Sequence, residues 1–188
     1  HAAFDEYAKK ARLISWGAEP GRTLAYEFAD GKLMFSAVSQ LQKFHPDALK
    51  EYLRDGAFAK ACAAASLIAI TDWTLYPHMT ACWAFLLDEV FAQLPGEPRF
   101  FFDLVDPSSR SESDIKGMLE VLRRFGEHGD VTLGLNQNEA NILSSLTGLS
   151  ASRADSPDSA LEQGSGLRSA LNLDAVVIHS IRYAAACS

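Results

Sequence analysis

The sequence predicts an α/β fold of three αβα layers, in which helices cover a mostly parallel sheet. Three observations favour this fold. Short apolar runs of the kind found in buried strands recur between residues 66 and 178. Segments with helical spacing of apolar residues separate these runs. The resulting order of strand, helix, strand, helix, strand, helix, strand is typical of parallel strands joined by crossover helices.

The chain before residue 66 is expected to hold short helices and one β-hairpin. A helix is expected over residues 4–14, and a second from Pro46 to about Arg54, ahead of an alanine-rich stretch. Between them, the segment over 21–35 alternates in polarity and turns at Asp30-Gly31, which is a strong hairpin signal. This hairpin lies outside the repeating pattern.

The elements of the repeating part follow from periodicity and from turn residues. Strands are expected at 66–70, 99–105, 130–135 and 174–179, and helices at 77–94, from 111 and from 136. A polar loop over 150–159 and a weak helix precede the last strand. Ligands of such sheets gather at the carboxyl ends of the strands. This rule selects residues 71–73, 103–110, 136–139 and 179–182.

Composition excludes several classes of protein. The 188 residues are 48% hydrophobic and 22% charged, as expected for one globular domain. The net charge of -7 predicts no general attraction to nucleic acid or to anionic membranes. No apolar run approaches the roughly 20 residues that span a bilayer. The three cysteines form no C-x-x-C pair, which favours a reducing, cytoplasmic compartment.

Several common catalytic motifs are absent from the sequence. The histidines show no H-x-x-x-H or H-x-x-E-H spacing, which makes a zinc hydrolase improbable. No G-x-S-x-G, G-x-G-x-x-G or G-x-x-x-x-G-K-[ST] run occurs. An α/β-hydrolase, a Rossmann dinucleotide fold and a P-loop NTPase are therefore disfavoured.

The segment GLNQNEANILSSLTG has two interpretations. Asn136 is a strong N-cap, and Glu139 stands at the third helical position, from which it can reach back to the cap in a capping-box variant. Alternatively, the exposed start of a helix after a buried strand suits a phosphate. The carboxylate beside it can then order a hydrated magnesium ion.

Together with other segments, this stretch resembles the PfkB, or ribokinase-like, family of carbohydrate kinases. That family carries an Asn-x-x-Glu motif near its magnesium and phosphates, and Asn136 and Glu139 match it, with Leu-Thr-Gly at 146–148. Four segments carry the resemblance in one order: GRTLAYEFADGKLMF, FFFDLVDPSSR, LNQNEANILSSLTG and LDAVVIHSIRYAAA. The run from Asp106 to Arg110 is similar to the family's Asp-Pro-Asn-x-Arg, and Asp103 is a competing match for its aspartate.

The resemblance implies an activity and a set of binding residues. We expect a kinase that transfers the γ-phosphate of ATP to a hydroxyl of a small sugar, with magnesium as cofactor. Asn136, Glu139, Asp103, Asp106 and Arg110 are the residues expected to bind the cofactors, and Glu139 is the expected metal residue. The hairpin resembles the family's lid over the sugar, which often also serves as a homodimer contact.

The sequence also departs from the family pattern. The family's Gly-Ala-Gly-Asp run, whose aspartate takes the proton from the sugar hydroxyl, does not occur among the 188 residues. The catalytic base is therefore unassigned. We expect residues 1–188 to form one α/β domain that corresponds to the central portion of the family, about 60% of a domain of about 300 residues. The alternative is a truncated or degenerate kinase-like protein that binds a ligand or partner without turnover.

Overall fold

The computed structural model describes residues 4–16, 21–150 and 156–188. It contains a five-stranded sheet and a separate two-stranded sheet. The prediction of an α/β fold with a mostly parallel sheet and a separate hairpin is confirmed.

The strands of the large sheet lie side by side in the order in which the chain makes them. The first four are parallel, and the last is antiparallel to its neighbour. They are β3 (Leu67–Thr71), β4 (Arg99–Asp103), β5 (Asp130–Asn136), β6 (Ala175–His179) and β7 (Ala184–Cys187). Strand β7 was not predicted, because its sequence Ala-Ala-Ala-Cys lacks the β-branched and aromatic residues that mark strands.

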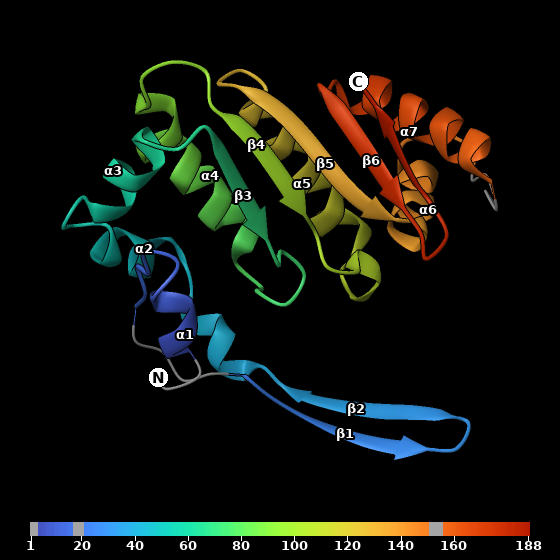
Figure 1. Ribbon diagram of the computed structural model, residues 1–188, viewed down its shortest axis with the longest axis horizontal. Coiled ribbons are helices and arrows are strands. Elements are labelled where there is room, and N and C mark those ends of the chain that lie inside the picture. Colours follow the sequence, from blue (N-terminus) through green and yellow to red (C-terminus); the bar gives the residue numbers. More distant parts are fainter. Residues whose placement is uncertain (1–3, 17–20, 151–155) are drawn as a thin grey trace.

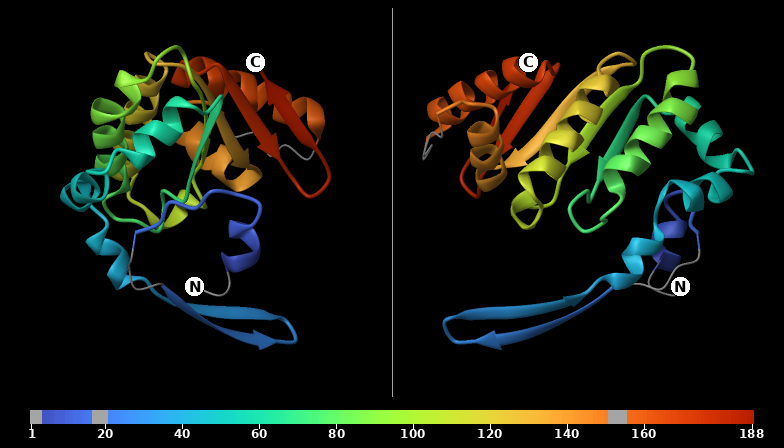
Figure 2. Two further views of the ribbon diagram at one scale, coloured as in Figure 1. Left: turned by 60° about the vertical axis from the view of Figure 1, so that its left-hand side comes forward. Right: turned by 180° about the vertical axis from the view of Figure 1, so that it is seen from behind.

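The helices of the repeating part lie on one face of this sheet, as the front and back views show (Figures 1 and 2). They are α4 (Met79–Glu89), α5 (Glu112–Phe125), α6 (Gln137–Leu146) and α7 (Pro157–Leu171), with short 3₁₀ turns η3 (Phe91–Gln93) and η4 (Pro107–Ser109). Right-handed crossovers between strands taken in consecutive order all pass over the same face. The strand order therefore explains why the helices share one side.

The opposite face of the sheet is open over the described residues. Side chains alternate between the faces of a strand, and Phe100 and Phe102 are fully buried under the helices. On the other face, Leu67 is 52% exposed. There the ring of Phe101 lies over Gly134, where an added Cβ would come within 2.7 Å of Cζ of that ring. Of the two helical layers expected from the sequence, the described residues supply one.

An aromatic cluster fills the space between the sheet and helices α4 and α5. The Phe125 ring packs edge-on against Phe100 at 5.0 Å and Phe102 at 4.9 Å between centroids. Trp83 contacts Phe102 at 5.0 Å, and Phe91 contacts Phe100 at 5.4 Å. This cluster fixes strand β4, and with it the loop that follows β4.

The N-terminal part forms small elements beside the sheet. They are α1 (Asp5–Ala8), β1 (Arg22–Phe28), β2 (Gly31–Ala37), η2 (Ser39–Lys43), α2 (Pro46–Tyr52) and α3 (Ala57–Ala63). The helix predicted over 4–14 is much shorter than expected, and none of its residues is buried to stabilise it. Trp16 stacks on Tyr52 with ring centroids 5.2 Å apart, which fixes the first segment against α2.

The hairpin β1–β2 extends away from the large sheet, on the side where strands β3 to β5 end (Figures 1 and 2). Every residue of both strands is exposed. Phe28 pairs with Gly31, so the turn consists of Ala29 and Asp30, one residue earlier than predicted.

Candidate active site

The carboxyl ends of the parallel strands meet at one edge, where the sequence predicted the site. Thr71 pairs with Asp103, and Asp103 pairs with Gly134 on the next strand. Asn136 ends β5 opposite His179 of β6. Polar side chains from strands far apart in sequence are thus placed next to one another.

The start of α6 is a capping box, as one of the two interpretations predicted. The Asn136 side chain accepts a hydrogen bond from the Glu139 N–H at 3.0 Å. Glu139 Oε2 accepts one from the Asn136 N–H at 2.7 Å. These reciprocal bonds fix the first turn of the helix at the edge of the sheet.

The other oxygen of Glu139 binds a second part of the chain. Glu139 is 3% exposed, and its Oε1 accepts a hydrogen bond from the Asp106 N–H at 2.8 Å. Asp106 Oδ1 in turn accepts from the Ser108 N–H at 3.2 Å and from Asn138 Nδ2 at 3.4 Å. The structure therefore brings Asp106, Asn136 and Glu139 together, and Glu139 joins the loop after β4 to helix α6.

The loop after β4 has an unusual backbone. Val105 and Asp106 both have positive φ, at 61° and 36°. Asp103 Oδ1 accepts a hydrogen bond from the Val105 N–H at 3.2 Å, which supports this conformation. Two successive non-glycine residues in the left-handed region store strain, and such strain clusters at functional sites.

Asp72, just after β3, lies at the same edge of the sheet as Asp103, Asp106 and Glu139. We call this edge the acidic edge. Its N–H donates to the Asp103 carbonyl at 3.1 Å, and its φ is 67°. Its Oδ1 is buried without a hydrogen-bond partner in the described part of the chain. Burial raises the pKa of the Asp72 carboxyl, a backbone hydrogen bond at Leu75 opposes the rise, and the charge of Asp103 adds to it. The rule for strand ends selects Asp72 at this edge, whereas the family resemblance does not include it among the binding residues.

Arg110 is engaged by the loop after β3. Its Nη1 donates to the carbonyls of Thr74 at 3.3 Å and Tyr76 at 3.1 Å, and its Nη2 donates to Pro77 at 3.3 Å. Its guanidinium lies 4.3 Å from the centroid of the fully buried Trp73 ring. Its described contacts are thus with residues 73–77 and Asp114, and none is with Asn136 or Glu139.

The acidic groups at this edge fit a hydrated magnesium ion. Residues 4–16, 21–150 and 156–188 contain no group of three or more His, Cys, Asp or Glu side chains that could enclose a metal. Mg²⁺ usually keeps several waters and binds through one or two carboxylates and the phosphates of a substrate. Asp106 is exposed, and its second carboxylate oxygen has no partner among the described hydrogen bonds.

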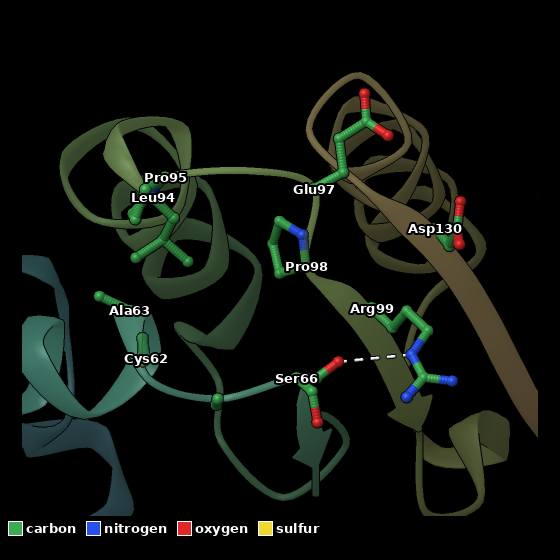
Figure 3. Close-up of a pocket in the computed structure, with 10 residues that line it drawn as sticks. Cys62, Ala63, Ser66, Leu94, Pro95, Glu97, Pro98, Arg99 and Asp130 are labelled. Atoms are coloured by element: carbon green, nitrogen blue, oxygen red, sulfur yellow. Dashed lines mark hydrogen bonds between the residues drawn. The ribbon is translucent and has the colours of Figure 1, made fainter.

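A cavity of about 340 Å³ lies at the opposite edge of the sheet, where the strands begin (Figure 3). Ser66, Arg99 and Asp130 line it, and Arg99 Nε donates to the Ser66 carbonyl at 3.4 Å. None of the predicted site residues lines this cavity. It is therefore separate from the acidic edge.

The comparison with protein families identifies the chain. The family model described as prokaryotic ketohexokinase matches residues 1–188. The chain belongs to this family. Ketohexokinase is a sugar kinase of the PfkB, or ribokinase-like, family, so the resemblance seen in the sequence is confirmed. No curated protein and no solved structure matched the chain.

In this member of the prokaryotic ketohexokinase family, the acidic edge holds the Asn-x-x-Glu motif in a defined geometry. None of the helices in the described residue ranges is long and apolar enough to cross a bilayer.

Proposed function

We propose that the chain forms the phosphate- and magnesium-binding part of a sugar kinase that transfers the γ-phosphate of ATP to a hydroxyl of a ketohexose. The family description supports a ketohexose as substrate. One observation carries the proposal: Glu139 links the first turn of α6 to the Asp106 loop by hydrogen bonds of 2.7 and 2.8 Å.

The first turn of α6 has the role of orienting an anion. The N-terminus of a helix carries positive partial charge and directs N–H groups toward a phosphate. The capping box keeps this turn in place at the edge of the sheet. When bound, ATP and magnesium supply the phosphoryl group and the neutralisation of its charge.

The carboxylates of Asp103, Asp106 and Glu139 have the role of holding a hydrated magnesium ion. Glu139 acts through water, because both of its oxygens already accept backbone hydrogen bonds. Asp106 offers the free carboxylate oxygen. Its contacts with Glu139 and Asn138 keep that oxygen near the first turn of α6.

The hairpin has the role of a lid over the sugar, and of a contact with a second copy of the chain. It lies on the side of the sheet where the strands end (Figure 1). Its exposed apolar side chains give it a surface for another protein or for closure.

We place the reaction in the cytoplasm, since Cys62, Cys82 and Cys187 are free thiols.

The test uses the full product of the gene that encodes these residues, and it measures ADP release with ATP, magnesium and a panel of ketohexoses and aldohexoses. Glu139→Gln is expected to lower kcat/KM by on the order of 10- to 100-fold, as loss of an outer-shell partner of a metal does. Glu120→Gln is the matched control, because Glu120 is an exposed glutamate of α5 that pairs with Arg123. Its kcat/KM should remain that of the wild type.

Two results would count against this proposal. Unchanged turnover in the folded Glu139→Gln variant would remove the magnesium role of that residue. If the wild type phosphorylates no sugar but calorimetry detects ATP or sugar binding, the alternative of a kinase-like binding protein gains support.

A further inference from the structure

Arg110 contacts the loop after β3 through hydrogen bonds and a stacked ring. Three carbonyls of residues 74–77 accept its guanidinium hydrogen bonds, at 3.1 to 3.3 Å, and the Trp73 ring lies beneath it. Its Nε faces Asp114 Oδ2 at 3.4 Å. The side chain is only 12% exposed. A largely buried guanidinium with four donor contacts and a stacked ring is held in one orientation.

The loop that Arg110 contacts also packs against the segment that follows the hairpin and η2. Phe44 and His45 follow the hairpin and η2 in the chain. The Phe44 ring packs edge-on against Tyr76 at 5.5 Å between centroids, and the His45 ring packs against His78 at 6.3 Å. Phe44 and His45, which η2 separates from the hairpin, therefore rest on side chains of residues 76–78.

On its other side, Arg110 belongs to the segment that forms the acidic edge. It follows η4, whose N-cap is Asp106. The two loops are also joined directly, because the Thr74 N–H and hydroxyl both donate to the Leu104 carbonyl, at 3.1 and 3.0 Å. A continuous set of contacts thus leads from Phe44, which follows η2, to Glu139.

We propose that Arg110 is a positioning residue that fixes the hairpin relative to the acidic edge. It holds residues 73–77 against the loop after β4, and this segment supports Phe44 and His45, from which η2 leads back to the hairpin. In this role Arg110 does not bind the phosphates of the nucleotide. This replaces the expectation from the family resemblance that Arg110 is a cofactor-binding residue. The part that concerns turnover rests on the proposed kinase function.

The first test is hydrogen exchange of the Arg110→Lys variant. Lysine keeps the charge but has one ammonium group, which cannot reach three carbonyls and stack on Trp73 together. Exchange in residues 38–45 and 73–79 should become about tenfold faster, as expected for a loss of about 1.4 kcal/mol in local opening. The amides of Phe44, Thr74 and Met79 are suitable reporters, because each donates a backbone hydrogen bond.

Two further variants serve as controls. Arg123→Lys changes an arginine of α5 that pairs with Glu120 on the helix surface, and its exchange should match the wild type. Asp114→Asn removes the negative charge opposite Arg110 Nε, at a residue in the first turn of α5 whose side chain is 46% exposed. This variant should accelerate exchange in the same two segments by a smaller factor. If Arg110→Lys does not fold, the exchange of Asp114→Asn tests the positioning role of Arg110.

The second test is kinetic. In Arg110→Lys, the KM for the sugar should rise about tenfold while the KM for ATP stays within about twofold, since a displaced hairpin weakens enclosure of the sugar alone. A raised KM for ATP with wild-type exchange would overturn the proposal in favour of direct phosphate contact. Wild-type exchange in both Arg110→Lys and Asp114→Asn would also overturn it. Exchange does not depend on turnover, so an inactive wild type would refute the kinase function without deciding the role of Arg110.

Discussion

Glu139 directs both of its carboxylate oxygens to backbone N–H groups, one from its own helix and one from a loop 33 residues earlier. Hydrogen bonds to an ionised acceptor contribute about 1.5–3 kcal/mol each. The residue is therefore both a structural link and a candidate metal residue. A thermal melt must accompany the kinetics of Glu139→Gln, because the amide can replace only one of the two acceptors.

Asp72 is held by the fold in two unfavourable states, a buried carboxyl group and a backbone with positive φ. Its pKa is raised by burial, and its φ of 67° is costly for most residues. A raised pKa in the folded state means that the folded protein is more stable when this carboxyl is protonated than when it is ionised. The destabilisation is absent below the unfolded pKa of about 3.9 and grows as the pH rises through the folded pKa.

We therefore predict that Asp72→Asn raises Tm at pH 7 and that this gain shrinks toward pH 4. Asparagine is neutral and, like aspartate, tolerates positive φ, so the substitution should add no backbone strain of its own. Calorimetry from pH 4 to pH 7 measures how the gain in Tm depends on pH. Asp30→Asn, at the exposed hairpin turn, is the control and should leave Tm unchanged. A lower Tm for Asp72→Asn at pH 7 would show that the carboxylate is stabilised instead.

At the scale of elements, the packing of β5 against β4 depends on two glycines. A Cβ at Gly129 would lie 2.0 Å from the Pro98 carbonyl oxygen, which is backbone. A Cβ at Gly134 would lie 2.7 Å from the tip of the Phe101 ring, on the open face of the sheet. The ring can turn aside, whereas the Pro98 carbonyl cannot move without shifting the strand.

We predict that Gly129→Ala lowers the free energy of unfolding by about 3 kcal/mol or more, and Gly134→Ala by about 1 kcal/mol. Gly117→Ala in α5 meets no atom within 4 Å and should stabilise by about 0.5–1 kcal/mol. Urea denaturation measures all three variants. Equal losses for Gly129→Ala and Gly134→Ala would contradict the distinction between backbone and side-chain contacts.

The elements differ in how well their sequence predicts them. Helix α5 was predictable because its buried residues, such as Ile115, Met118 and Leu122, recur at helical spacing. The capping box was predictable because Asn136 and Glu139 are three residues apart. The bond from Asp106 to Glu139 was not, since it depends on two backbone conformations that are rare for their residues. The hydrogen bonds of Arg110 were also not predictable from the sequence, because their acceptors are backbone carbonyls, which every residue has.

At the scale of the whole molecule, the hairpin carries a group of exposed apolar side chains. Leu24, Tyr26 and Phe28 alternate along β1 and share one face, and Leu33 and Phe35 pair with Tyr26 and Leu24 across the turn. These side chains are 52–64% exposed. The other face carries pairs such as Thr23 with Ser36. A hairpin with one apolar face and two unpaired edges favours contact with a second copy.

We predict that the protein forms a dimer through this face, and that the double substitution Leu24→Ser and Phe35→Ser shifts it to a monomer. Loss of two large apolar contacts removes a few kcal/mol from such an interface. Light scattering coupled to size-exclusion chromatography measures the mass. The control is Thr23→Ala with Ser36→Ala, on the polar face, which should remain dimeric. A wild type that is monomeric at high concentration would refute the prediction.

The agreement between strand order and chain order has a consequence for how the protein is made. Strands β4, β5 and β6 of the large sheet each pair with the strand synthesised just before them. As the chain leaves the ribosome, every new strand-helix unit therefore meets an edge that already exists, without waiting for distant sequence. Strand β7 pairs with β6 in the opposite direction, so it too meets a neighbour that has just been made.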